Sequence, residues 1–102
     1  MKVYDKLVRD RIPEVIERNG STCETIKVNR EEHYQRLKEK LMEEVTEFIQ
    51  DENIEELADI YEVIAALSDF VGKGEEELME VRNKKREERG GFKEGIVLKS
   101  TR

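Results

Sequence analysis

Residues 31–50 and 54–71 carry apolar side chains at steps of three and four, the spacing of one face of an α-helix. Only three polar residues, Asp51-Glu52-Asn53, separate the two stretches. Two helices joined by so short a turn pack antiparallel, so we expect a helical hairpin at the centre of the chain. Asn29 and Asn53 each have a Glu three residues later, a pattern typical of a helix start.

The flanking segments predict shorter elements. Residues 10–20 favour a short helix, with Asp10 as its cap, Pro13 in its first turn and Gly20 at its end. Residues 75–88 predict a third long helix, which Gly90-Gly91 stops. Residues 23–28 and 96–98 are expected to be short extended segments that can pair with each other or with another chain. The prediction is therefore an all-α antiparallel helical bundle, with residues 1–102 as one domain.

Composition supports this fold class. Charged residues make up 43% of the chain and apolar residues 36%, which suits helices with one narrow apolar stripe. A β-sandwich or a parallel α/β sheet needs longer apolar runs. A chain of 102 residues buries only a modest core, so we expect a second chain to help complete it.

The sequence also bears on location. No run approaches the roughly 18 apolar residues of a membrane span, and the opening MKVYDKLVRD does not resemble a signal peptide. The single cysteine, Cys23, cannot form an internal disulfide. We therefore expect no membrane partner and a reducing, cytoplasmic setting.

Charge is distributed unevenly along the chain. Residues 31–80 carry a net charge of −13, whereas residues 1–30 carry +2 and residues 81–102 carry +5. Most of the central acids are expected to form a solvated helix face. The chain as a whole, at −6, is too acidic for general binding to a nucleic-acid polymer, which needs a continuous basic surface.

Four acids of the hairpin lie at matched distances from its turn. Counted from Glu52, Glu47 lies five residues before and Glu56 four after, while Glu44 lies eight before and Asp59 seven after. Each pair is spaced i, i+3, which places both side chains on one helix face. Facing pairs would repel unless basic side chains or divalent cations neutralise them. A site made of carboxylate oxygens favours Mg²⁺ or Mn²⁺.

Three of the four acids also have a simpler interpretation. Glu56 is the capping partner of Asn53, and Glu44 and Glu47 can pair with Lys40 or face solvent. A carboxylate-bridged di-iron centre is disfavoured, because such centres use Glu-x-x-His motifs and the one histidine, His33, lies outside the four acids.

Mg²⁺ bound by carboxylates usually takes further ligands from the phosphates of a substrate, so cationic side chains are candidates for contacts with such phosphates. Arg82, Lys85 and Arg89 share one face of the third long helix by their spacing. Lys6 and Arg9 in the opening segment are further candidates. The alternative for the helix is a solvated basic face, since cations near a helix C-terminus also favour the helix dipole.

The motif Glu43-Glu44-Val45-Thr46-Glu47, followed by Glu56-Leu57-Ala58-Asp59, resembles the EExxE…ExxD signature of the all-α NTP pyrophosphatases, the MazG-like superfamily. The opening YDKLVRDRIPEVIERNG and the closing VRNKKREERGGF look like its phosphoribosyl-ATP pyrophosphohydrolase-like, house-cleaning branch. The similarity covers roughly residues 3–98. It implies a Mg²⁺-dependent enzyme, active as a dimer, a tetramer or another oligomer, that cleaves the α–β phosphoanhydride of a natural or modified nucleoside triphosphate to a monophosphate and pyrophosphate.

The resemblance also implies roles for individual residues. Its metal ligands correspond to Glu44, Glu47, Glu56 and Asp59, and Glu43 is the candidate that orients or deprotonates the attacking water. Two alternatives remain open. One is hydrolysis of phosphoribosyl-ATP in histidine synthesis, and the other is a helical module without catalytic activity that binds a nucleotide or a protein.

Overall fold

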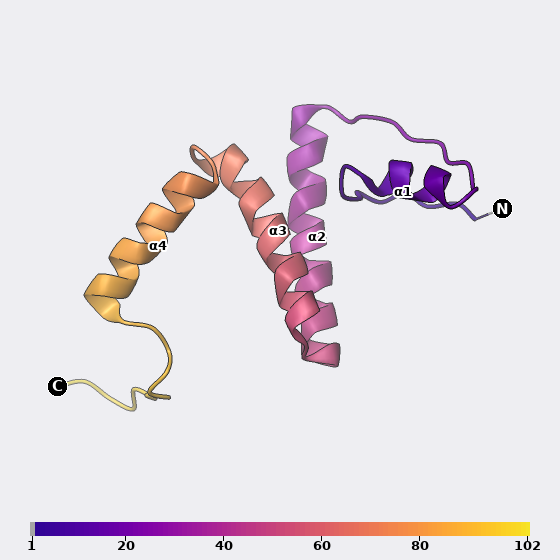
Figure 1. Ribbon diagram of the computed structural model, residues 1–102. Helices are drawn as coiled ribbons and strands as arrows, with labels where there is room; N and C mark the ends of the chain where they lie inside the picture. Colours follow the sequence, from indigo (N-terminus) through magenta and orange to yellow (C-terminus); the bar gives the residue numbers. More distant parts are fainter. Residues whose placement is uncertain (1) are drawn as a thin grey trace.

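The computed structural model describes residues 2–102, which form four α-helices and no β-strand (Figure 1). The helices are α1 (Ile12–Arg18), α2 (Arg30–Asp51), α3 (Ile54–Val71) and α4 (Glu75–Arg89). The predicted all-α class is thus confirmed, and the ends of the three long helices lie within one residue of those expected.

Side-chain caps explain where the two central helices begin. The Asn29 side chain accepts a hydrogen bond from the backbone N–H of Glu32 at 2.8 Å, and the Asn53 side chain accepts one from Glu56 at 2.9 Å. Between the helices, Glu52 adopts the left-handed conformation, with φ of 49°, and so ends α2 and reverses the chain. The expected cap of α1 is corrected: the capping position is Arg11 rather than Asp10, and no side chain caps it.

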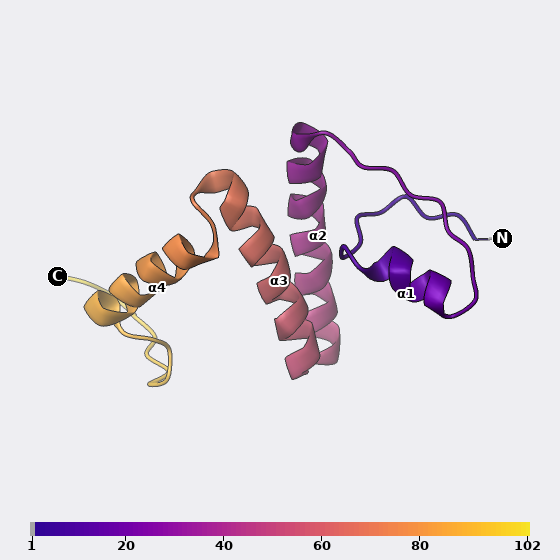
Figure 2. The same ribbon diagram turned by 45° about the horizontal axis from the view of Figure 1, so that its top comes forward.

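The α2–α3 hairpin contains the small core. The two helices lie side by side in both ribbon views, and Leu37 and Val63 are the buried apolar residues among residues 2–102 (Figures 1 and 2). α4 packs against α3, where the Tyr61 hydroxyl lies 3.4 Å from the Met79 sulfur, and it does not contact α2. The hairpin therefore contains the core, and α4 is attached to it through α3.

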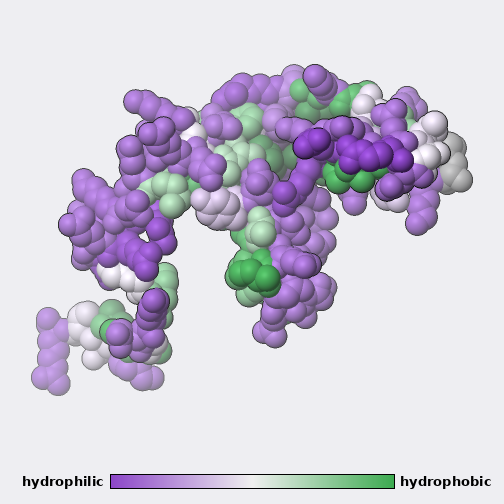
Figure 3. Space-filling model, in the orientation of Figure 1, coloured by the Kyte–Doolittle hydropathy of each residue, from purple (hydrophilic) through white to green (hydrophobic). Residues whose placement is uncertain are grey.

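The molecule is elongated. Its extents are 61 × 31 × 22 Å and its radius of gyration is 17.9 Å, against about 13 Å for a compact domain of 100 residues. The accessible surface is 9582 Å², whereas a compact chain of this size exposes about 6,000 Å². Figure 3 shows hydrophobic residues at the surface of the hairpin and of the C-terminal tail. Much apolar area is thus left uncovered by the chain itself.

The two expected extended segments lie outside the helices. Residues 23–28 are part of the connection between α1 and α2, and residues 96–98 follow α4. The segments lie on opposite sides of the hairpin (Figures 1 and 2). They do not pair within residues 2–102, because a strand needs a neighbouring backbone and the fold provides none there.

None of the helices in residues 2–102 combines the length and the apolar character that crossing a membrane requires.

Candidate metal centre

Five acidic side chains gather where the C-terminal half of α2 meets the first turns of α3. We call these residues the acidic cluster: Glu43, Glu44, Glu47, Glu56 and Asp59. Ligand oxygens of Glu43, Glu44 and Glu47 lie within 4.8 Å of one another, and so do those of Glu44, Glu56 and Asp59. Glu44 belongs to both groups, so it joins the acids of α2 to those of α3.

The local sequence accounts for this convergence. The left-handed Glu52 and the Asn53 cap set the register of α3 against α2. The i, i+3 spacing within each helix then brings both acids of a pair to the same face. The structure therefore brings together Glu44, Glu47, Glu56 and Asp59, the four acids that lie at matched distances from the turn at Glu52.

Glu44 is the buried member of the cluster. Its relative exposure is 7%, and its Oε2 is buried without a hydrogen-bond partner. Burial raises the pKa of the Glu44 carboxyl, and the adjacent Glu47 raises it further, whereas the charge of Lys40 opposes the shift. Such a carboxylate is costly to ionise unless a cation approaches the free oxygen.

Glu56 presents a second free oxygen from the opposite helix. Its backbone N–H serves the Asn53 cap, but its side-chain Oε2 is buried without a hydrogen-bond partner. Loss of hydration raises the pKa of Glu56, and the charges of Glu47, Asp51 and Asp59 add to the effect. Capping alone therefore does not explain this side chain.

Two basic side chains partly neutralise the cluster. The Lys40 Nζ lies 3.6 Å from Glu43 Oε1 and 3.6 Å from Glu44 Oε1. On the α3 side, the Arg9 guanidinium donates to Asp59 Oδ1 at 2.7 Å. Two cations face five carboxyl groups, so the acids outnumber their basic partners.

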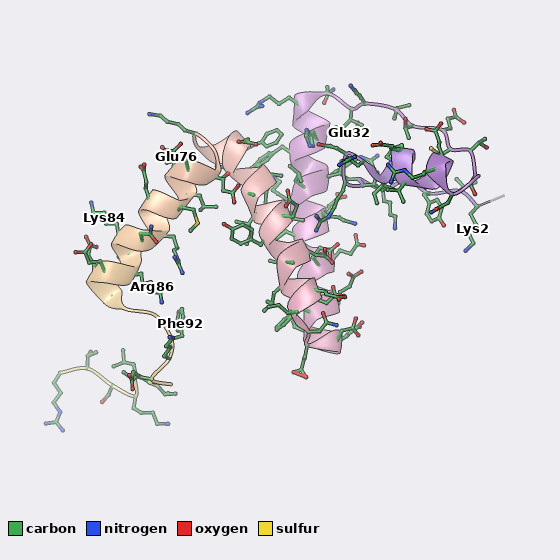
Figure 4. All side chains as sticks on the ribbon, in the orientation of Figure 1. Lys2, Glu32, Glu76, Lys84, Arg86 and Phe92 are labelled. Carbon is green, nitrogen blue, oxygen red and sulfur yellow. The ribbon has the colours of Figure 1, made fainter. Side chains whose placement is uncertain are left out.

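The predicted phosphate-binding residues fall into two sets. Lys6 and Arg9 lie on the N-terminal segment beside α2, and Arg9 reaches the cluster. The others, Arg82, Lys85 and Arg89, are exposed on α4, which contacts α3 but not α2. The Arg82 side chain donates to Asn83 at 3.0 Å. Figure 4 shows the neighbouring Lys84 and Arg86 on the part of α4 that lies away from the hairpin. Within one chain, α4 and the cluster are thus not brought together.

A cavity of about 160 Å³ lies beside the cluster, between the N-terminal segment and α2. Its lining consists of Asp5, Lys6, Leu7, Arg36, Glu39, Lys40 and Glu43. Glu43 belongs to both the cavity lining and the acidic cluster, and Lys40, its ion-pair partner, also lines the cavity, so the two lie next to each other.

The contacts of the N-terminal segment join residues far apart in the sequence. Arg9 and Asp59 are 50 residues apart, and Arg36 binds Asp5 across 31 residues. No local pattern signals such pairs. The contact between Lys40 and Glu44 does have a signal, the i, i+4 spacing of opposite charges on α2.

The donor set fits a hard divalent cation. All candidate ligand atoms are carboxylate oxygens, the type that Mg²⁺ and Mn²⁺ prefer. Oxygens bound to one Mg²⁺ at about 2.1 Å lie roughly 3–4 Å apart, so groups within 4.8 Å need little movement. The unpartnered oxygens of Glu44 and Glu56 are an independent indication, because a bound cation would satisfy both.

In comparisons of sequence and structure, no family model, no curated protein and no solved structure gives a significant match to this chain.

Proposed function

We propose that the protein is a Mg²⁺-dependent nucleotide pyrophosphohydrolase that cleaves the α–β phosphoanhydride of a nucleoside triphosphate. The observation that carries the proposal is the buried Glu44 oxygen without a hydrogen-bond partner, at the point where acids of α2 and α3 meet. Mn²⁺ is the alternative metal. The resemblance of the EExxE…ExxD motif to the MazG-like pyrophosphatases gives the reaction class.

In this proposal the acidic cluster divides into two roles. Glu44, Glu47, Glu56 and Asp59 hold the metal, which supplies charge neutralisation for the phosphates and activation of a water. Glu43, at the exposed edge of the cluster, orients that water or accepts its proton. The water oxygen forms a bond to the α-phosphorus, and the bond from that phosphorus to the oxygen bridging the α- and β-phosphates breaks. The products are the nucleoside monophosphate and pyrophosphate.

The phosphates carry more negative charge than the metal neutralises, so cations of the protein complete the site. Lys6 and Arg9 lie on the same chain beside the cluster. Arg82, Lys85 and Arg89 are exposed on α4. We propose that α4 of a second copy brings these three residues to the acidic hairpin.

Assembly into a dimer or tetramer with a shared antiparallel bundle is supported by what one chain leaves exposed. The accessible surface exceeds that of a compact chain by roughly 3,600 Å² per chain. Interfaces of obligate oligomers bury about 2,000–5,000 Å² summed over both partners, which is roughly 1,000–2,500 Å² from each chain. Met42 and Ile49 on α2 and Ile54 on α3 are each at least 68% exposed. The net charges of −13 over residues 31–80 and +5 over residues 81–102 are complementary between copies.

The test is an assay of pyrophosphate release with Mg²⁺ and a panel of natural and modified nucleoside triphosphates, together with phosphoribosyl-ATP. Glu47→Gln and Asp59→Asn are expected to abolish release while the helical circular dichroism is retained. Glu55→Gln is the matched control, because this exposed acid of α3 lies outside the cluster and should leave turnover unchanged.

Two results would count against the proposal. One is the absence of pyrophosphate release with every substrate from a folded, assembled protein. The other is a melting temperature that does not respond to Mg²⁺, since a ligand that binds the folded state must stabilise it.

A further inference from the structure

The N-terminal arm, residues 4–9, is fastened to the hairpin at two points of different character. At its start, Arg36 of α2 donates to the Asp5 carboxylate at 3.1 Å and to the Asp5 carbonyl at 3.3 Å. At its end, Arg9 binds Asp59 of α3 at 2.7 Å. The first point lies outside the acidic cluster, whereas the second lies within it. The ribbon views show the arm reaching the hairpin from the side of α1 (Figures 1 and 2).

The contact at Asp59 engages a carboxylate that also belongs to the acidic cluster. Asp59, Glu44 and Glu56 place ligand oxygens within 4.8 Å of one another. The Arg9 guanidinium and a divalent cation are both positive, and each gains most from the same ionised carboxylate. Neutralising Asp59 by Arg9 also reduces the negative potential that attracts a dication to the cluster.

The contact is also weak enough to exchange. The side chains of Arg9 and Asp59 are 55% and 41% exposed, and ion pairs in such positions contribute little to stability. The other attachment consists of two hydrogen bonds from Arg36, which is 24% exposed, to Asp5, which is 88% exposed. It lies outside the acidic cluster, so a cation at the cluster competes with the contact at Asp59 and not with the contact at Asp5.

We propose that Arg9 competes with the divalent cation for Asp59, so that the end of the arm leaves α3 when a cation binds and Arg9 becomes available to the substrate phosphates. This inference rests on the proposed function, because it takes the acidic cluster as the metal site. The Asp5–Arg36 contact does not involve the acidic cluster, so the exchange does not require it to break. Arg9 thus moves from one anion to another at the edge of the same site.

The first test is calorimetric titration of the full chain with Mn²⁺ and with Mg²⁺ at fixed ionic strength. Arg9→Gln removes the competing charge and is expected to bind the cation about two- to fivefold more tightly than the unmodified protein. Arg11→Gln is the matched control. Arg11 is two residues away and pairs with Glu14 instead of the cluster, so its loss should leave affinity unchanged. Equal or weaker cation binding by Arg9→Gln would overturn the inference.

The second test follows the arm itself by limited trypsin digestion. Cleavage after Arg9 is expected to become severalfold faster when Mg²⁺ is added, because the released end of the arm is more accessible. Cleavage after Arg18, which pairs with Glu14 at the end of α1, is the internal reference and should not change. A cation that slows cleavage after Arg9, or leaves it unaltered, would show that the arm does not respond to it.

The two proposals fail in different ways. If the unmodified protein and Arg9→Gln bind the cations equally well and digestion is unchanged, the competition is wrong while the metal site stands. If neither protein binds Mg²⁺ or Mn²⁺, the metal site itself is wrong and the inference falls with it.

Discussion

Glu44 links the chemistry of the cluster to the stability of the fold. Its carboxyl is buried and its pKa is raised above the usual 4.5, so the folded chain binds a proton more tightly than the unfolded chain does. The stability that this residue contributes is therefore present below pH 4.5 and is lost as the pH rises through the raised pKa.

Glu44→Gln should consequently stabilise the protein at neutral pH, because the neutral amide avoids burying a charge. The gain in melting temperature over the unmodified protein is expected to grow between pH 4 and pH 8. Thermal melts by circular dichroism at fixed protein concentration measure it, with Glu55→Gln as a control that shows no such trend. A variant less stable than the original at pH 7 would contradict this account of Glu44.

Lys40 is expected to offset part of the free-energy cost of burying the ionised Glu44 carboxylate. Its Nζ lies 3.6 Å from Glu44 Oε1 and its side chain is 20% exposed. Lys40→Met should lower the free energy of unfolding by about 1–2 kcal/mol at pH 7, because Glu44 loses its nearest counter-charge. In the Glu44→Gln background, Lys40→Met should lower the free energy of unfolding by less. A double-mutant cycle from urea denaturation measures the interaction free energy between the two residues.

At the scale of the elements, substitutions at the two asparagine caps distinguish an effect on the stability of the fold from an effect on the geometry of the acidic cluster. Asn29 caps α2 and Asn53 caps α3, each through a side-chain oxygen at 2.8–2.9 Å from a backbone N–H. Substitution of either by Ala should lower the free energy of unfolding by about 1 kcal/mol.

Only Asn53→Ala should also weaken Mg²⁺ binding, because Asn53 fixes the first turn of α3 that carries Glu56. Urea denaturation and calorimetric titration of the two variants give both quantities. Equal metal affinity in the two variants would show that the cap does not hold the site in place.

The elements also show which features a sequence reveals. The Asn caps and the three-and-four spacing of apolar residues are local patterns, so the ends of α2, α3 and α4 could be predicted closely. The distances of Glu44 and Asp59 from the turn sufficed to pair them, because a short connection fixes the register of two helices. Residues 96–98 have strand-forming side chains but no adjacent backbone, and that absence is a property of the whole fold.

At the scale of the whole molecule, exposed apolar residues on the hairpin predict self-association. Ile49 is 68% exposed. On a monomer, Ile49→Glu would change stability by less than about 0.5 kcal/mol. In an assembly it should reduce the mass found by light scattering after gel filtration and should make the melting temperature depend less on protein concentration, because dissociated chains no longer gain stability by mass action. Gln50→Glu adds the same charge at the next position and serves as the control.

A monomeric mass for the unmodified protein at micromolar concentration would contradict this prediction.

The contacts of Arg9 with Asp59 and of Arg36 with Asp5 also belong to this scale, since they join residues 50 and 31 positions apart. The sequence named Arg9 as a cation without indicating its partner, because only the folded path of the arm brings the two together.

The scarcity of buried apolar residues has a consequence for the life of the protein in a cell. With Leu37 and Val63 as the buried apolar residues of residues 2–102, a single copy has little free energy to oppose unfolding. Newly made copies would be susceptible to proteases until they meet one another. The steady-state concentration of the protein should therefore rise more steeply than its rate of synthesis, because a higher concentration favours association, and associated chains are degraded more slowly.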